Sequence, residues 1–176
     1  MKKIFSIIAI SVLGFSQAQV IIGDQTGTAS NKTSVLLEFA AGQNKGIILP
    51  YVRTMPTTPT EGTILVDSSN ATNVAIRYYN GSWKDLSNGN KADISTALNN
   101  QPTVIEDTNS KAIIGASSSS ANGVLVLEST TKAMVLPQVA STDDIINPAP
   151  GMMVYINGTN KRLAVFNGSK WTFWAP

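Results

Sequence analysis

The sequence of 176 residues contains no cysteine and no histidine, and only 14% of its residues are charged. The absence of these two residue types excludes a Ser-His-Asp triad, a cysteine nucleophile, thiolate or imidazole metal ligands and a disulfide framework. A formal net charge of +2 is too small for the basic footprint of a nucleic-acid or anionic-membrane binder. Hydrophobic residues nevertheless make up 43% of the chain, which argues against a highly charged, disordered protein.

The one long apolar run lies at the N-terminus. Lys2 and Lys3 precede an apolar stretch over residues 4–15, which is shorter than the roughly 20 residues that a membrane-spanning helix needs. Small residues then stand at Ser16 and Ala18. The pattern predicts a signal peptide at residues 1–18, cleaved after Ala18, with a buried core helix as the alternative. We therefore expect a secreted or outer cell-surface protein with no membrane span after cleavage, and the lack of cysteine fits a bacterial envelope.

The remainder of the chain contains an internal repeat. Matching segments recur in the same order roughly 90 residues apart, as expected for a duplicated unit. They are Ile21-Ile22-Gly23 with Ile113-Ile114-Gly115, Leu37-Glu38 with Leu127-Glu128, 45–50 with 132–137, 62–66 with 151–155, and Asn80-Gly81-Ser82 with Asn167-Gly168-Ser169. We expect a first β repeat at 19–87, a polar linker at 88–112 and a second β repeat at 113–176. Within the linker, Asp93 could cap one short helical turn that runs through Leu98.

Each copy ends in the pattern of an antiparallel β-meander. Asn80-Gly81 and Asn167-Gly168 lie between β-rich segments, and Asn-Gly is the strongest short-range hairpin signal. A further strand precedes each hairpin, at 62–67 and 151–156. The fold class is therefore all-β, with a short helical linker and two copies of a small antiparallel meander unit. The second copy has one more residue before its tryptophan, Trp171, which predicts a bulge or register shift there.

The front half of each copy predicts a second pair of short strands around a turn. Pro50 and Pro137 end these strands because proline cannot donate to a β-ladder. Residues 141–146 predict one helical turn in which Asp143 and Asp144 serve as capping residues. Such small copies with exposed strand edges need cover, so we expect the copies to pack together or the chain to assemble with itself. The four predicted strands are 35–39, 46–49, 124–127 and 133–136.

The order of these motifs resembles a repeat of secreted surface proteins of Bacteroidota and is similar to segments of phage tail-fibre-type proteins. The resemblance covers nearly the whole mature chain, twice. It implies an exported, non-enzymatic structural or adhesive protein of the cell surface, often in fibre-like assemblies. The implied partners are further copies of the chain, with a trimer among the candidate states, or other surface proteins. The family's usual Pro-Arg reads Pro50-Tyr51 and Pro137-Gln138 here, so no role of that arginine is carried over.

Aromatic residues near the hairpin turns are the candidate ligand or interface residues. Aromatic side chains can stack on sugar rings, which makes a carbohydrate-binding module the alternative function. Aromatics beside a hairpin turn more often pack across strands, and both interpretations stay open at this point. The residues are Tyr78, Tyr79, Trp83, Phe166, Trp171, Phe173 and Trp174.

The acidic residues do not form a recognisable catalytic or metal-binding pattern. Glu38 and Glu128 recur at matching positions, and we expect them to pair with Lys45 and Lys132 or to face solvent. Residues 67–73 offer oxygen ligands but lack the spacing of a calcium loop, so a plain turn is favoured. The sequence thus predicts no catalytic residue, no cofactor, no metal and no nucleic-acid partner; a hydrolase that uses carboxylates alone is the remaining enzymatic alternative.

Overall fold

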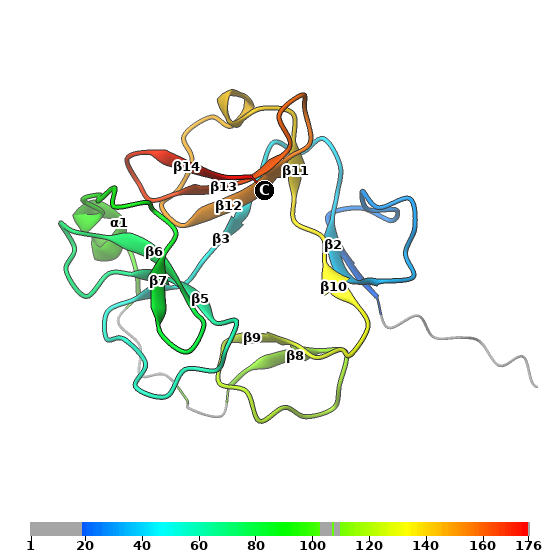
Figure 1. Ribbon diagram of the computed structural model, residues 1–176, viewed down its shortest axis with the longest axis horizontal. Helices are drawn as coiled ribbons and strands as arrows, with labels where there is room; N and C mark the ends of the chain where they lie inside the picture. Colours follow the sequence, from blue (N-terminus) through cyan, green and yellow to red (C-terminus); the bar gives the residue numbers. More distant parts are fainter. Residues whose placement is uncertain (1–18, 103–106, 108–109, 176) are drawn as a thin grey trace, which may run out of the picture.

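The computed structural model describes residues 19–102, 107 and 110–175 (Figure 1). This part is built from short strands, with one short α-helix and one 3-10 turn, which confirms the all-β prediction. The predicted signal peptide at 1–18 lies outside the described residues. No helix within the described ranges is long and apolar enough to cross a membrane.

The strands are two to five residues long and follow the order of the sequence repeat. The first copy contains β1 (Val20–Ile22), β2 (Val35–Phe39), β3 (Ile47–Ile48), β4 (Tyr51–Val52), β5 (Ile64–Asp67), β6 (Ala75–Tyr79) and β7 (Trp83–Asp85). Helix α1 (Ser95–Asn99) follows. The second copy contains β8 (Ala112–Ile114), β9 (Leu125–Leu127), β10 (Ala133–Met134), β11 (Gln138–Val139), the 3-10 turn η1 (Thr142–Asp144), β12 (Met152–Ile156), β13 (Arg162–Phe166) and β14 (Trp171–Trp174).

The two meanders have the same topology. Their strand orders are β4-β5-β6-β7 and β11-β12-β13-β14. In each, the first two strands are parallel and the rest are antiparallel. Both predicted Asn-Gly turns connect the last two strands. The described residues therefore contain two meanders of the same strand order, and Figure 1 shows them at the left and at the top of the molecule.

The predicted bulge in the second meander is wrong. Trp171 lies opposite Phe166, as Trp83 lies opposite Tyr79 in the first copy, and the β13–β14 register is regular. The turn absorbs the extra residue instead. The side-chain oxygen of Asn167 accepts hydrogen bonds from the backbone amides two and three residues later, at 2.9 Å each. A longer turn closed by its own asparagine leaves the β-ladder undisturbed.

The front-half strands form where the sequence predicts them, but they do not pair with each other. Strand β2 lies between β1 and β10 and is parallel to both. Strand β3 instead joins the second meander, antiparallel to β12. Strands β8 and β9 form a two-stranded parallel sheet. Each copy thus donates one strand to the other copy, β3 in one direction and β10 in the reverse direction.

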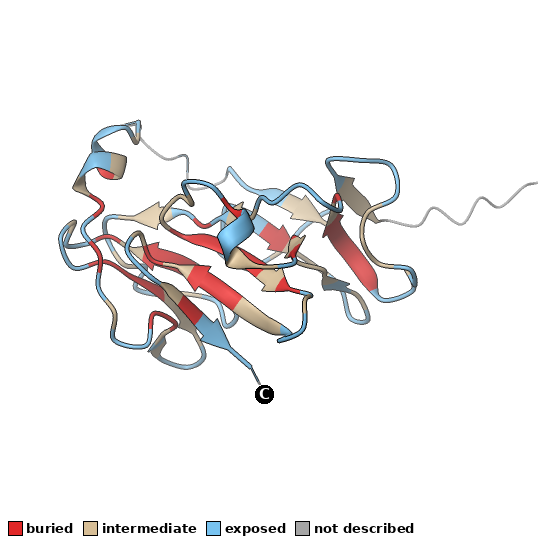
Figure 2. Ribbon diagram, turned by 90° about the horizontal axis from the view of Figure 1, so that it is seen from above, coloured by how far each residue is buried: buried red, intermediate tan, exposed pale blue. Residues whose placement is uncertain are grey.

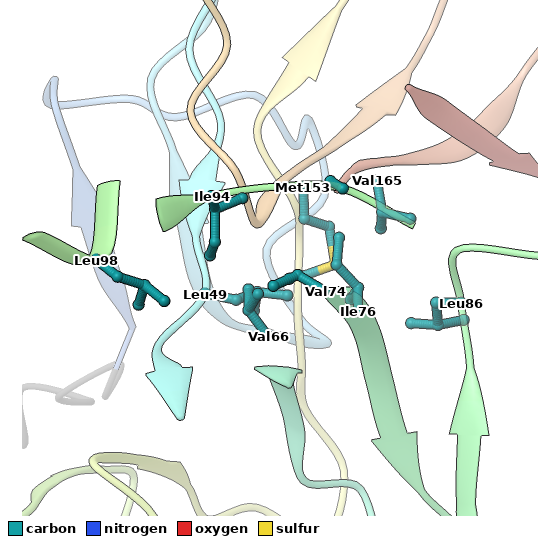
Figure 3. Packing of buried hydrophobic residues seen from close by; sticks show 10 residues of the cluster. Leu49, Val66, Val74, Ile76, Leu86, Ile94, Leu98, Met153 and Val165 are labelled. Carbon is teal, nitrogen blue, oxygen red and sulfur yellow. The ribbon is translucent and has the colours of Figure 1, made fainter. Parts of the chain in front are cut away.

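Both copies contribute to one hydrophobic cluster, which we call the central core. Figure 3 shows Met153 and Val165 of the second meander among side chains of the first. The segment treated as a linker in the sequence also packs here, and Val74 forms a β-bridge with Ala92. Helix α1 ends one residue beyond the predicted Leu98. Its N-cap residue is Ile94, with no side-chain cap hydrogen bond, and not the predicted Asp93; the Asp93 carboxylate accepts from the backbone N–H of Ser95 at 2.9 Å. The central core contains Leu49, Val66, Val74, Ile76, Leu86, Ala92, Ile94, Leu98, Met153 and Val165.

A second cluster covers the opposite face of the second meander. It contains Val139, Ile145, Met152, Val154, Ile156 and Ala164. Because side chains alternate along a strand, β12 and β13 supply one face to each cluster, and Figure 2 shows buried stretches along these strands. The predicted helical turn is present as η1 and directly precedes Ile145 of this cluster. Its capping box is complete: the Asp144 carboxylate accepts from the backbone N–H of Ser141 at 3.1 Å.

Truncation of a central-core side chain should destabilise the whole described fold. Ile76 is 0% exposed and belongs to the cluster that the two meanders share, so Ile76→Ala removes buried methyl groups from the core of both copies. We expect the free energy of unfolding to fall by about 2–5 kcal/mol. Urea denaturation measures the change. The matched control is Ile146→Ala, at a side chain that is 87% exposed, for which a change within about 0.5 kcal/mol is expected. Equal losses in the two variants would contradict the shared core.

Candidate functional site

The aromatic residues at the two hairpin ends form cross-strand pairs. The ring centroids of Tyr79 and Trp83 are 5.3 Å apart with an interplanar angle of 63°. Those of Phe166 and Trp171 are 5.2 Å apart at 45°. Each pair consists of directly opposed residues on neighbouring strands. Edge-to-face and tilted geometries are favourable for aromatic rings and stabilise a hairpin beyond the area that it buries. Tyr78 lies elsewhere, half-buried against the central core.

The C-terminal strand β14 docks onto the first copy. The indole N–H of Trp174 donates to the carbonyl of Leu86 at 3.0 Å, and the Thr172 hydroxyl donates to the carbonyl of Ser87 at 3.3 Å. Phe173 is exposed, but the Arg162 guanidinium lies 4.0 Å from the centre of its ring. The seven predicted aromatic residues are therefore distributed over the core, two hairpin ends and the terminal strand.

Glu38 is buried and holds the loop between β1 and β2. Its carboxylate accepts hydrogen bonds from the backbone amides of Thr28 and Ala29, at 2.9 Å each. It also forms an ion pair with Lys32 and accepts from the Gln19 side chain. The predicted partner Lys45 and the solvent-facing alternative are both wrong for this residue. Glu38 faces the loop that carries Lys32, and a carboxylate at 0% exposure needs local donors.

The environment of Glu38 favours its charged form. Burial raises the pKa of the carboxyl, but the hydrogen bonds from Lys32, Ala29 and Thr28 and the charge of Lys32 outweigh burial. The net pKa is therefore lowered. A carboxylate that accepts several backbone N–H bonds is stabilised in this way.

Glu128 belongs to a related clamp in the second copy. The Ser119 hydroxyl donates to its carboxylate. Lys111, which precedes β8, donates to the carbonyls of Ser119 at 2.6 Å and Ala121 at 3.0 Å. The Glu128 side chain thus bonds to the loop between β8 and β9, and not to the predicted Lys132. Both glutamates have a structural part in holding the loop between the first two strands of their copy.

The candidate calcium loop is a turn closed by its own side chains. Asp67 forms an ion pair with Arg77 at 2.7 Å and accepts from the Ser69 hydroxyl at 2.7 Å. Burial raises the pKa of Asp67, but these hydrogen bonds and the Arg77 charge outweigh burial and lower the pKa overall. Within the described ranges, no group of three or more acidic residues is placed to hold a metal ion.

Exposed aliphatic side chains mark strand edges that the sequence reasoning did not identify as sites. Ile48 of β3 is 53% exposed and Leu125 of β9 is 50% exposed. Ile22 and Val124 are exposed as well. The sequence pattern that could have indicated these strands is two or more adjacent aliphatic residues in a short strand. Neighbouring residues in a strand point to opposite faces, so both faces of such a strand require cover. These edges are the candidate interaction surface.

The comparison with protein families concerns the second copy. Residues 113–175, about a third of the chain, match the family model described as "Phage tail like trimerisation region". The match begins in β8 and ends beyond β14. It confirms the similarity to phage tail-type segments for this part of the chain. Comparison with curated proteins and with solved structures gives no match.

The Glu38 clamp predicts a loss of stability in acid. A pKa that is lowered by folding contributes stability that is present above the pKa of the unfolded chain and is lost as the pH falls through the folded pKa. The free energy of unfolding should therefore fall as the pH drops below the ordinary value of 4.5. Glu38→Gln should cost about 1–3 kcal/mol at pH 7 and should flatten this acid dependence. Denaturation at a series of pH values tests both effects, with the exposed Glu61→Gln as control. If the free energy of unfolding of Glu38→Gln fell with acid as steeply as that of the unsubstituted chain, the result would contradict the clamp.

Proposed function

We propose that this chain is an exported, non-enzymatic structural protein that assembles with itself as a trimer through its β-strands. The observation that carries this proposal is the match of residues 113–175 to a trimerisation region of phage tail type. The matched segment forms a complete strand unit, from β8 to β14. It also contains one of the two strands that the copies exchange.

The strand pairing supports assembly. The two copies are held together by β3 on β12 and by β10 on β2, so strand addition is already the way in which one unit binds another. Two-stranded sheets are marginally stable in isolation, and β8–β9 is such a sheet with exposed aliphatic residues. Strands of this kind are covered by pairing with further strands.

A structural role is also supported by how the acidic groups are used. Glu38, Asp67 and Asp144 are engaged by a lysine, an arginine and backbone amides in local contacts. Acid–base catalysis in this chain would need carboxylates, because it has no histidine or cysteine. An adhesive role at the surface of a Bacteroidota cell belongs to the same proposal and rests on the motif resemblance. The N-terminal pattern supports export.

Carbohydrate binding stays a prediction that the observed contacts do not favour. The hairpin aromatics pack on each other, Arg162 lies over Phe173, and the Trp174 indole is tied to the first copy. Sugar-binding platforms need accessible ring faces. We therefore assign these residues to packing in the proposed function.

The mature chain should be a trimer in solution. Sedimentation equilibrium of residues 19–176 should give a mass three times that of one chain, because strand edges that carry exposed aliphatic residues favour association. The result should not depend on ionic strength to any large degree, since these edges are apolar and uncharged. A single-chain mass over the whole concentration range would contradict the proposal.

The exported form should begin near Gln19. N-terminal sequencing of protein expressed from the full chain in a bacterial host should find cleavage after Ala18, and fractionation should find the protein outside the cytoplasm. Ala18→Arg should block cleavage, because the processing enzyme requires a small residue there. Full-length protein that stays in the cytoplasm of the unsubstituted strain would contradict export.

A further inference from the structure

The chain contains two copies of each strand but makes only half of the cross-copy pairings that these strands allow. Strand β3 of the first copy pairs with the start of β12 in the second. Its counterpart β10 pairs with β2 in the first copy. By the repeat, the start of β5 is equivalent to the start of β12, where β3 binds. The outer edge of β9 is equivalent to the edge of β2 where β10 binds. Neither the start of β5 nor the outer edge of β9 has such a strand partner in the part of the chain that the structure describes.

The exchanged strands use opposite edges. The backbone N–H of Leu49, just after β3, donates to the carbonyl of Gly151 at 3.1 Å. In the second copy, Leu136 occupies the position of Leu49, since each directly precedes a proline. The amides that bind β2, however, are those of Ala133 and Val135, three residues and one residue before Leu136. Because consecutive amides in a strand point to opposite sides, each exchanged strand leaves free the edge that its counterpart uses.

The start of β5 is open where the start of β12 is covered. Gly62 and Gly151 directly precede these strand starts and have similar backbone angles, with φ at 85° and 78°. A methyl group on Gly151 would lie 2.5 Å from Val66 Cγ2 and 3.3 Å from the Leu49 carbonyl, whereas one on Gly62 would meet no atom within 4 Å. Gly62 is exposed and Gly151 is buried. The start of β12 therefore has a strand packed against it, whereas the equivalent start of β5 faces open space.

The outer edge of β9 shows the same contrast with β2. Val35 of β2, which aligns with Leu125 in the repeat, lies opposite Ala133 of β10 and is 3% exposed. Leu125 of β9 is 50% exposed. The backbone of Val124 accepts from Ala112 of β8, so the groups of Leu125 point away from β8. On the exchanged strand β3, Ile48 is 53% exposed. Exposed aliphatic side chains therefore lie both on β3, a strand that could add to another sheet through its free edge, and on β9, a strand whose free edge could receive it.

We propose that the second copy of one chain binds the first copy of a neighbouring chain through the two missing pairings. Strand β10 adds antiparallel to the start of β5 of the neighbour, and the neighbour's β3 adds parallel to β9. Both pairings fall between the same two copies, so the contact between chains repeats the contact within the chain. The inference rests on the proposed self-assembly and specifies its geometry: a head-to-tail contact, which closes into a ring or continues as a fibre.

The side chains on the unused strands fit this arrangement. Gly46 packs so closely on β12 that a methyl group there would lie 2.6 Å from Met152 Cγ. The counterpart of Gly46 is Ala133, and the counterpart of Met152 is Thr63. The added methyl group of alanine thus meets a smaller side chain on β5. The observed pairing of Ile48 with Met152 predicts that Val135 lies opposite Thr63 of the neighbouring chain.

A mixing experiment tests the head-to-tail arrangement. The tail variant Ala133→Arg with Leu125→Lys blocks the second copy, and the head variant Thr63→Arg with Ile48→Lys blocks the first. Sedimentation velocity should find each variant monomeric alone. An equimolar mixture should give a heterodimer, because one intact tail meets one intact head. The control Ala41→Arg with Ile146→Lys substitutes exposed residues outside these edges and should assemble like the unsubstituted chain.

The outcomes separate the two proposals. A monomeric unsubstituted chain overturns self-assembly and the pairing together. An oligomeric unsubstituted chain with equally oligomeric head and tail variants overturns the pairing alone. Monomeric variants that are folded by circular dichroism and fail to associate when mixed overturn the head-to-tail arrangement.

Cysteine cross-linking provides a second test that does not depend on disrupting the interface. The chain has no cysteine of its own. Directly opposed residues of a non-hydrogen-bonded antiparallel pair have Cα atoms about 4.5 Å apart, within the range that a disulfide spans. Thr63→Cys with Val135→Cys should therefore give disulfide-linked chains on a non-reducing gel, and Thr63→Cys with Ala41→Cys should not. Equal cross-linking of the two variants, or none in an oligomeric protein, would overturn the register.

Discussion

Backbone hydrogen bonding of very short strands is the constraint from which the rest of this structure follows. A strand of two residues offers few amides and carbonyls, and it is stable only when a longer strand supplies the complementary edge. The exchange of β3 and β10 between the copies provides such an edge in both directions. It requires close backbone approach, which explains glycine at Gly46 and Gly151. The exchange also brings Met153 and Val165 against the first meander, so the central core depends on it.

The same constraint links the fold to assembly. Two copies in one chain can exchange strands only once in each direction. The start of β5 in the first copy and the outer edge of β9 in the second copy are therefore left without a strand partner in the described part of the chain. Many proteins protect such edges with lysine, proline or a covering loop. Here Ile48 and Leu125, which are uncharged and half exposed, lie on strands that have one unpaired edge each in the described part of the chain. A chain with 14% charged residues and edges of this kind has the composition of a subunit rather than of an isolated domain.

Much of the local structure was predictable because its signals are local. The Asn-Gly turns, the alternation around Ile76, the helical turn near Leu98 and the cap at Ser141 depend on residues within a few positions of each other. The strand exchange was not predictable, since two-residue strands carry no register information and their partners lie far away in the sequence. The bulge near Trp171 was wrong for a related reason: a turn and a ladder can each absorb one residue, and the pattern does not distinguish them.

The candidate site was predicted only in part. The aromatic residues were found, but their pairing across strands and the docking of Trp174 on Leu86 depend on tertiary structure. The importance of Glu38 was visible in the repeat, whereas its partner Lys32 was not, because the loop that carries the lysine folds back over the carboxylate. The exposed edges were missed because exposure follows from which strands find partners, and that is decided by the exchange.

Hydrogen–deuterium exchange at increasing protein concentration tests the central claim most directly. Amides on an unpaired strand edge exchange rapidly, and pairing of that edge protects them. The account predicts that peptides covering 62–65 and 124–127 gain protection as concentration rises, while peptides covering β2 and the start of β12 are protected throughout. Protection at 62–65 and 124–127 that is independent of concentration, in a protein shown to associate over the same range, would contradict it.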